Sequence, residues 1–193
     1  QDPATGNYGF EWSNQKDNLD AAPRTRPVVS NVTFIGTATN KDLVETKSSA
    51  VKLKEGTGGD IHNAIFAYSY NAVVELTEEA TEIVADAGDI AITDTIFFKS
   101  SLADGGASPY KISDGSTWDL KGFVEDADNR NHIDVDPLLG SVTWGAADIV
   151  PAAGSPALGN GRAVTGAEPT DYIGAVKDAA GDWTKGWTNY APN

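Results

Sequence analysis

The chain has no cysteine and no methionine among its 193 residues. The lack of cysteine excludes disulfides, zinc–thiolate sites and thiol catalysis. Only two histidines are present, His62 and His132. His62 lies inside a short apolar run, where packing or solvent exposure is a simpler interpretation than a role as base or ligand. No run of about 18 apolar residues occurs, so no transmembrane segment is predicted.

Basic residues are also scarce. The 14 lysines and arginines face 28 aspartates and glutamates, and the formal net charge is −14. This balance argues against nucleic acid as a partner, because affinity for nucleic acid depends on neutralising phosphates. It argues equally against anionic membrane surfaces. Two interpretations of the acidity remain, namely solubility outside the cell and carboxylates that bind Ca²⁺.

What the chain does have is an internal repeat. An aliphatic residue is followed two positions later by Asn or Asp and then by an aliphatic or aromatic pair. The pattern is centred on Asn31, Asn63 and Asp94, which are spaced by 32 and 31 residues. A fixed period of this size indicates a stacked, repeating architecture. Each copy is short, β-branched and aromatic, so the turns of this solenoid are predicted to be strands.

Stacked windings would place like side chains above one another. Asn31, Asn63 and Asp94 would then form a ladder at one corner, each bonding the backbone of its neighbour. The alternative for these three residues is a ligand-binding role. Phe34, Phe66 and Phe97 are expected to form an aromatic stack.

Further elements are predicted from local patterns. Strands are expected at residues 8–12, at 28–35, and at 50–54, which would pair with 71–76. Later strand fragments are expected at 123–124, 133–135 and 172–176. Residues 77–84 have helix character, although a capping box is incomplete, so one helical turn and no helix are both open. Residues 102–120 are predicted to be a loop.

The closing part of the chain carries a family resemblance. Residues 136–139 (Asp-Pro-Leu-Leu), followed by the turn-rich 151–158, resemble the last coils of secreted bacterial β-helix proteins of the pectate-lyase-like superfamily. The tail at 171–176 and 182–188 looks like the C-terminus of uncharacterised lipoprotein-type members, and 27–36 and 51–58 resemble their opening coils. The sequence departs from the usual turn at 158–160, where an acidic residue is common.

The repeat and the resemblance together predict an all-β fold. We expect a right-handed parallel β-helix, a solenoid with long loops and a C-terminal cap, forming one domain over residues 1–193. Coils would occupy 1–149, and a terminal coil and cap 150–193. Because the chain begins with Gln and has no Met, we expect a mature fragment of a longer precursor.

The resemblance raises the question of catalysis. Lyases of this superfamily use Ca²⁺ and an Arg or Lys base on uronic acid polymers. The candidates here are Arg24, Arg26, Lys52, Lys54 and Lys99. None of them sits in a recognisable lyase motif, and an alternating lysine pair is typical of a solvated strand face. The paired carboxylates that glycoside hydrolases need are not apparent either. No catalytic residue is therefore predicted, and the chain is expected to lack enzymatic activity, although the question stays open.

The densest group of oxygen ligands lies within residues 125–136. The candidate metal ligands are Asp126, Asp128, Asp134 and Asp136, and Ca²⁺ is the cofactor that such oxygens would favour. EF-hand spacing fails because Arg130 occupies the fifth position counted from Asp126. The alternative is a polar turn between coils, with no cofactor bound.

Trp183 and Trp187 stand four residues apart near the end of the chain. They could contact a glycan by stacking on a sugar ring. The alternative is that they cap the open end of the core, as terminal segments of solenoids must.

These observations predict a protein of the extracellular space or the cell surface. We expect a non-catalytic structural or adhesive protein, because no catalytic constellation is apparent. No helix is expected to cover the first coil, so its strand edges could template another chain and support end-to-end self-assembly into filaments. The alternative is a carbohydrate-active protein, either a polysaccharide lyase or a glycan-binding module, with polysaccharide as its partner.

Overall fold

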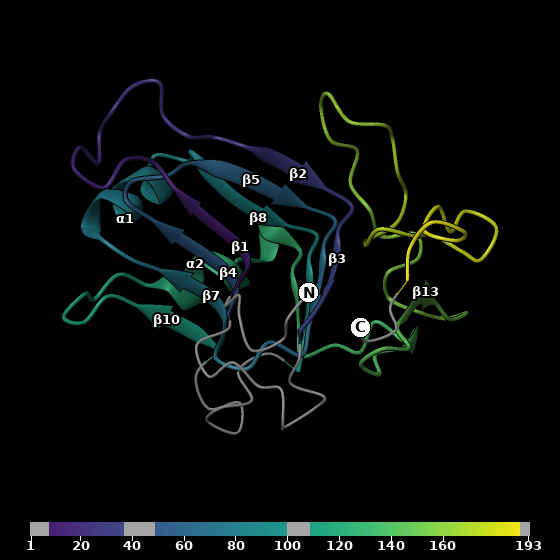
Figure 1. Cartoon of the computed structure of the whole chain (residues 1–193). Helices are drawn as coiled ribbons and strands as arrows, with labels where there is room; N and C mark the ends of the chain where they lie inside the picture. Colours follow the sequence, from purple (N-terminus) through teal and green to yellow (C-terminus); the bar gives the residue numbers. More distant parts are fainter. Residues whose placement is uncertain (1–7, 37–48, 100–108, 190–193) are drawn as a thin grey trace.

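Strands dominate the computed structural model, which describes residues 8–36, 49–99 and 109–189. Within these residues the strands form three parallel sheets (Figure 1). The first sheet has the order β1 (Tyr8–Ser13), β4 (Ser49–Lys54), β7 (Ala72–Leu76) and β10 (Tyr110–Ile112). The second has β2 (Val28–Ser30), β5 (Gly59–His62) and β8 (Ile90–Thr93), and the third has β3 (Thr33–Ile35), β6 (Ile65–Ala67), β9 (Ile96–Phe98) and β11 (His132–Ile133). The prediction of an all-β fold is confirmed.

The chain passes repeatedly through the three sheets in the same order. We call each pass through the first, second and third sheets a winding. The first winding is β1, β2 and β3, and the second is β4, β5 and β6. The third is β7, β8 and β9, with helix α1 (Glu79–Asp86) inserted between β7 and β8. In the fourth, α2 (Leu120–Glu125) and the 3₁₀ helix η4 (Ala127–Asn129) take the place of a strand between β10 and β11.

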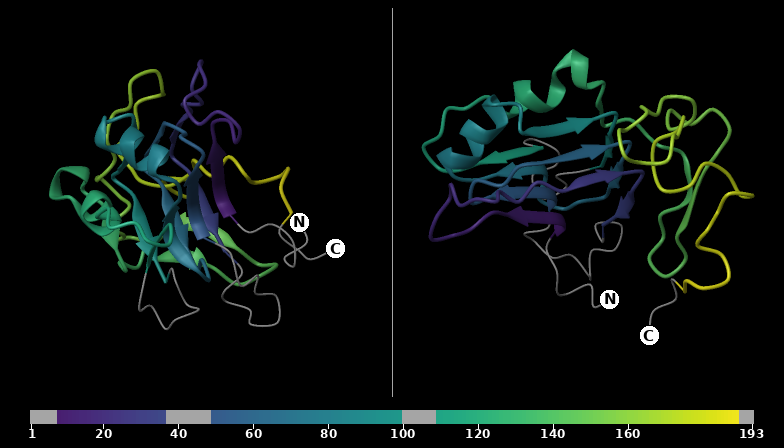
Figure 2. Two further views of the ribbon diagram at one scale, coloured as in Figure 1. Left: turned by 90° about the vertical axis from the view of Figure 1, so that its left-hand side faces the viewer. Right: turned by 90° about the horizontal axis from the view of Figure 1, so that it is seen from above.

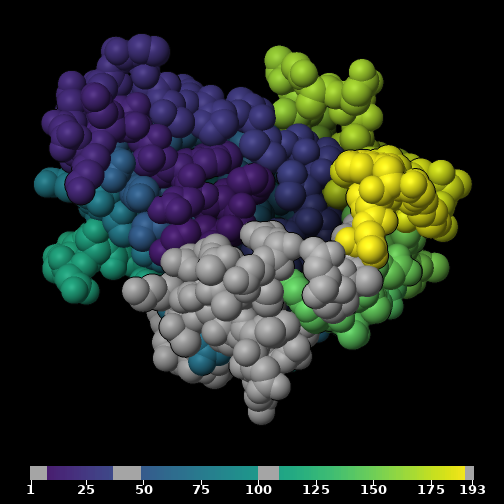
Figure 3. Space-filling model, in the orientation of Figure 1, coloured from purple at the N-terminus to yellow at the C-terminus, as the bar shows by residue number. Residues whose placement is uncertain are grey.

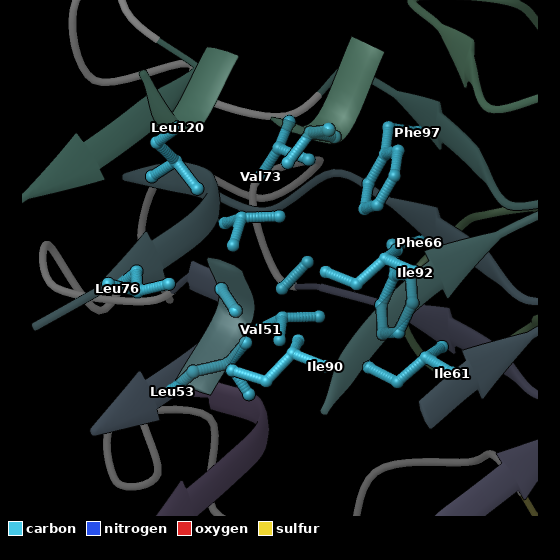
Figure 4. Packing of buried hydrophobic residues seen from close by; sticks show 14 of the residues in the cluster. Val51, Leu53, Ile61, Phe66, Val73, Leu76, Ile90, Ile92, Phe97 and Leu120 are labelled. Atoms are coloured by element: carbon cyan, nitrogen blue, oxygen red, sulfur yellow. The ribbon is translucent and has the colours of Figure 1, made fainter. Parts of the chain in front are cut away.

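Side chains that the sequence repeat predicts to be equivalent lie in register. Phe34 pairs with Phe66 and Phe66 with Phe97 in the third sheet. The rings of Phe66 and Phe97 are stacked with centroids 5.6 Å apart (Figure 4). Those of Phe34 and Phe66 are tilted, with centroids 6.2 Å apart. The predicted aromatic stack is confirmed. Both inner rings, Phe66 and Phe97, are fully buried and anchor the core between the sheets.

The corner between the second and third sheets has a local cause. Asn31, Asn63 and Asp94 have φ values of 57°, 51° and 50°, in the left-handed region. Asn and Asp adopt this conformation more readily than other residues with a side chain. The left-handed residue bends the backbone, so that the strand expected over 28–35 is divided into β2 and β3.

Four local expectations differ from the structure. Helix α1 has eight residues, where one helical turn or no helix is expected at 77–84. Residues 123–124 belong to α2 and not to a strand, because Leu120 and Val124 are buried one helical turn apart and Asp119 accepts a hydrogen bond from the Gly122 amide at 2.8 Å. β10 lies inside the segment expected to be a loop. The strand expected at 172–176 is reduced to an isolated bridge between Leu158 and Tyr172.

The core between the sheets is closed at its far end by α2. Its side chains Leu120 and Val124 are 3% and 0% exposed and belong to the same apolar cluster as Phe66 and Phe97. The view from above in Figure 2 shows this helix beyond the last strands of the body. The helix of residues 79–86 lies at one side and contacts β8. None of the helices in the described ranges is both long and apolar enough to cross a membrane.

The chain after residue 138 packs outside the sheets. It starts with an antiparallel hairpin of β12 (Leu139–Ser141) and β13 (Asp148–Pro151). Ala157 and Ile173, both fully buried, form a second small core with Ile65 and Ile96, whose side chains face outward from the third sheet. Figure 3 shows this C-terminal part beside the strand body.

Candidate functional site

The corner residues of the repeat hold the C-terminal segment. The Asn63 side chain, fully buried, donates from Nδ2 to the Arg162 carbonyl oxygen at 2.7 Å, and its Oδ1 accepts from the Arg162 amide at 2.8 Å. The side-chain nitrogen Nδ2 of Asn31 donates to the carbonyl oxygens of Tyr172 and Gly174 at 2.9 and 3.2 Å. These side chains therefore bind backbone groups more than 95 residues away in the sequence, as a neighbouring strand would.

Contacts along the corner itself are weaker. The Asn63 Nδ2 lies 3.4 Å from the Asn31 Oδ1, a long separation for a hydrogen bond. Main-chain pairing continues through the corner. The main-chain amides of Asn31 and Asn63 donate to the carbonyl oxygens of His62 and Thr93 in the next winding, at 3.1 and 3.2 Å. The structure thus brings Asn31, Asn63 and Asp94 to equivalent positions, with their side chains directed mainly to other partners.

Asp94 differs from the two asparagines because it is charged. Its carboxylate is 1% exposed and forms ion pairs with Arg130 and, at 2.6 Å, with Arg162 Nε. A buried carboxylate needs such partners, since its transfer out of water is costly. The guanidinium of Arg162 also donates to the Asp128 carbonyl oxygen at 3.2 Å. Sequence reasoning missed both arginines, because their partner lies in another segment of the chain.

His62 lies close to this charged corner. Burial lowers the pKa of His62 below its usual value, and the positive charge of Arg162 also lowers it. The carboxylates of Asp60 and Asp94 act in the opposite direction but do not reverse the shift. Its Nδ1 is 2.8 Å from the Thr93 hydroxyl on the neighbouring strand. His62 is therefore a neutral, hydrogen-bonded side chain of the sheet face.

The candidate lyase bases are engaged in contacts within the protein. Arg24 donates to the carbonyl oxygens of Leu19 and Gly56, and Arg26 pairs with Asp89 at 2.5 Å. The Nζ of Lys99 lies 5.7 Å from the centroid of the Phe98 ring. Each of these three cations therefore has a contact within the protein.

Lys52 and Lys54 are held as cations. Burial by itself lowers the pKa of Lys52, but its contacts with Glu75, 2.9 Å from Nζ, and with the Tyr8 hydroxyl outweigh burial, and the pKa is raised. A hydrogen bond with Glu11, at 2.9 Å, raises the pKa of Lys54. A general base must be able to give up its proton near neutral pH. A raised pKa therefore makes both lysines unsuited to that role.

Lys52 belongs to an ordered row of charges on the first sheet. Glu11, Lys52, Glu75 and Lys111 lie in register on β1, β4, β7 and β10, so that the sign of the charge alternates from strand to strand. Opposite charges on neighbouring strands stabilise a sheet face. The alternation of apolar and charged residues in 50–54 was the sequence signal for this row.

The predicted calcium ligands do not converge. The Asp126 carboxylate accepts from the Asp128 amide at 2.8 Å, and the Asp136 carboxylate accepts from the Leu138 amide at 2.8 Å. Asp134 accepts from the Lys99 amide at 3.4 Å. Within residues 8–36, 49–99 and 109–189, no group of three or more acidic or histidine side chains could hold a metal ion. The alternative, a polar turn, fits this segment, because Asp126 and Asp136 each cap a backbone amide two residues further on.

Trp183 and Trp187 lie on the surface of the C-terminal segment. Their side chains are 56% and 69% exposed, and the rings stack on each other with centroids 5.6 Å apart. The indole nitrogens donate to main-chain oxygens, Trp183 to Ala175 at 2.9 Å and Trp187 to Trp183 at 2.6 Å. α2 covers the far end of the core, and neither tryptophan belongs to the two apolar core clusters.

A known protein family matches the part of the chain that contains the three parallel sheets. The family model described as a pectate-lyase-like β-helix domain matches residues 1–138. Neither the curated proteins nor the solved structures contain a match to the chain. The matched segment ends before β12 and leaves the C-terminal part, with both exposed tryptophans, outside it.

Proposed function

We propose that this chain, which belongs to the pectate-lyase-like β-helix domain family, is a non-catalytic structural or adhesive protein. Its place would be outside the cell or on the cell surface. The finer architecture that we propose is a right-handed solenoid. It is supported by the three parallel sheets and by the left-handed corner residue that recurs in three windings.

One observation carries the non-catalytic assignment. The candidate bases Lys52 and Lys54 are paired with carboxylates that raise their pKa values, and Arg24 and Arg26 are bound to carbonyl oxygens and to Asp89. A lyase of this fold needs a base that is free to reach the substrate. The sheet surface instead carries a row of neutralised charges, which is suited to stability and to contacts along its length.

Filament growth is not part of the proposal. α2 contributes Leu120 and Val124 to the core at the far end, so a second copy stacking head to tail would have to displace this helix. The strands of the first winding pair on one side only within the described residues, because β1, β2 and β3 are the edges of their sheets. Association through that end would produce closed pairs and not long fibres.

The test of the proposal is a search for polymer cleavage. The full chain is incubated with uronate polymers, with and without Ca²⁺, and the ultraviolet absorbance of unsaturated products is followed. Neutral polysaccharides are treated in parallel and assayed for new reducing ends. We expect no product in any arm. Product release that is lost in Lys52→Met would overturn the assignment and favour a lyase.

A further inference from the structure

The strongest unexplained feature of the surface is the tryptophan pair outside the family domain. Trp183 and Trp187 are the two largest side chains among the exposed apolar residues of the described chain. Large apolar groups exposed together mark contact sites more often than single exposed residues do. Neither ring belongs to the apolar clusters of the core, whose far end α2 covers.

The two rings are held in place and remain largely exposed. Each indole N–H bonds a main-chain oxygen, and the two rings stack on each other. Between them in the sequence, Thr184 is 6% exposed and anchors the segment by donating from its hydroxyl to Asp182 at 2.6 Å. A rigid aromatic surface loses little conformational entropy when it binds a ligand.

The size of the surface points to a small ligand. At 56% and 69% exposure, two indoles offer about 300 Å² of contact area. A stable interface between proteins buries about 800 Å² on each partner. The pair is therefore too small to hold a second protein by itself, but it matches the flat face of one or two sugar rings.

Charge restricts the chemistry of that ligand. The chain carries a net charge of −14, which opposes the approach of anionic polymers such as uronates. Lys185, beside the rings in the sequence, already pairs with Asp182 at 3.8 Å and donates to the Ala179 carbonyl oxygen at 3.0 Å. Its remaining N–H can serve a hydroxyl group but does not make the site cationic.

We propose that Trp183 and Trp187 form a binding site for neutral glycans, in which the apolar face of a pyranose ring stacks on the exposed indoles. This inference rests on the proposed adhesive function and names the contact through which the protein would adhere. The site belongs to the C-terminal segment and is independent of the sheet faces of the family domain.

The test uses native electrophoresis of the full chain in gels that contain a neutral glucan, a neutral mannan or polygalacturonate. We expect retardation by at least one neutral polymer and none by polygalacturonate. The change Trp187→Ala should weaken binding at least tenfold, and Trp187→Phe should retain part of it. Trp118→Phe is the matched control, because Trp118 is bonded to Asp86 through its indole nitrogen and lies far from the pair in the sequence.

Several results would overturn the inference. They are the absence of retardation by both neutral polymers, equal retardation of wild type and Trp187→Ala, or retardation by polygalacturonate alone. A dimer in analytical ultracentrifugation that Trp187→Ala converts to a monomer would assign the rings to a second copy instead. Polymer cleavage with an intact tryptophan effect would refute the proposed non-catalytic function and leave this site standing.

Discussion

At the scale of single residues, Asn63 shows how a side chain can replace a strand. Its amide group binds both main-chain groups of Arg162, as the backbone of a neighbouring strand would. It does so from a left-handed backbone conformation that Asn tolerates better than most residues. One residue type thus meets two requirements, the bend at the corner and the attachment of the C-terminal segment.

The change Asn63→Ala should therefore be strongly destabilising. It removes two hydrogen bonds of a buried side chain, leaves the Arg162 amide without its partner, and places alanine, which tolerates left-handed backbone less well than Asn, at φ 51°. We expect a loss of about 3 kcal/mol in the free energy of unfolding, measured by urea denaturation. Asn63→Gly, which relieves the backbone but not the lost bonds, should cost less. A loss below about 0.5 kcal/mol in both variants would contradict this role.

Lys52 provides a test through pH. Its pKa in the folded protein is raised above the ordinary value of 10.5, so its contribution to stability is complete below 10.5 and is lost as the pH rises through the folded pKa. Lys52→Met should be less stable than wild type by about 2 kcal/mol at neutral pH, because Glu75 is left buried without its cation. Above pH 10.5 this difference should shrink.

The measurement is the urea midpoint of both proteins from neutral pH to above 10.5. Lys111→Met is the matched control, because Lys111 ends the same row of charges and bonds Asn71, at 3.3 Å, on the exposed surface. Its pH profile should follow that of wild type. If the difference between wild type and Lys52→Met stayed constant across the range, the ion pair with Glu75 would not be the cause.

At the scale of elements, the strands depend on one another. Most have three or four residues, too short to be stable alone, and each is held by the winding above or below it. The repeat ends where this mutual support ends. There, α2 supplies apolar side chains in place of a further strand, and the hydrogen bond that Asp119 accepts from the Gly122 amide caps the start of the helix.

Replacing Leu120 by Ala tests this closure. Leu120 is 3% exposed in the core, and its truncation should reduce the free energy of unfolding by about 3 kcal/mol. Lys121→Ala, on the exposed side of the same helix, removes only an ion pair with Glu125 and should cost less than about 0.5 kcal/mol. The two losses of stability are compared by thermal denaturation of both variants. Similar costs for the two changes would mean that α2 does not close the core.

At the scale of the whole molecule, two apolar cores share one sheet. The larger lies between the three parallel sheets, and the smaller lies between the outer face of the third sheet and the C-terminal segment. Ile65 and Ile96 belong to the smaller core, while their strand neighbours Phe66 and Phe97 belong to the larger. The C-terminal segment is therefore packed against the family domain and oriented by it.

Calcium should not stabilise the molecule. Asp126 and Asp136 bind local amides, and the acidic residues of 126–136 form no group that could hold a metal ion, so no ion should bind the folded state in preference to the unfolded one. We expect the same melting temperature in Ca²⁺ and in a chelator, measured by circular dichroism at constant ionic strength. A rise with Ca²⁺ that Asp126→Asn abolishes would restore the metal site.

The sequence by itself determined the repeating strands, the aromatic stack and the absence of cysteine chemistry. These features depend on local properties: the period of about 31 residues, alternation along a strand, and the tolerance of Asn and Asp for left-handed backbone. Only the tertiary structure decided the partners of Asn63 and Asp94, the closure of the core by α2 and the exposure of Trp183 and Trp187. Each of these depends on which distant segments meet. No local pattern encodes the contact between Asn63 and Arg162, because the two residues stand 99 positions apart in the sequence and meet only in the folded chain.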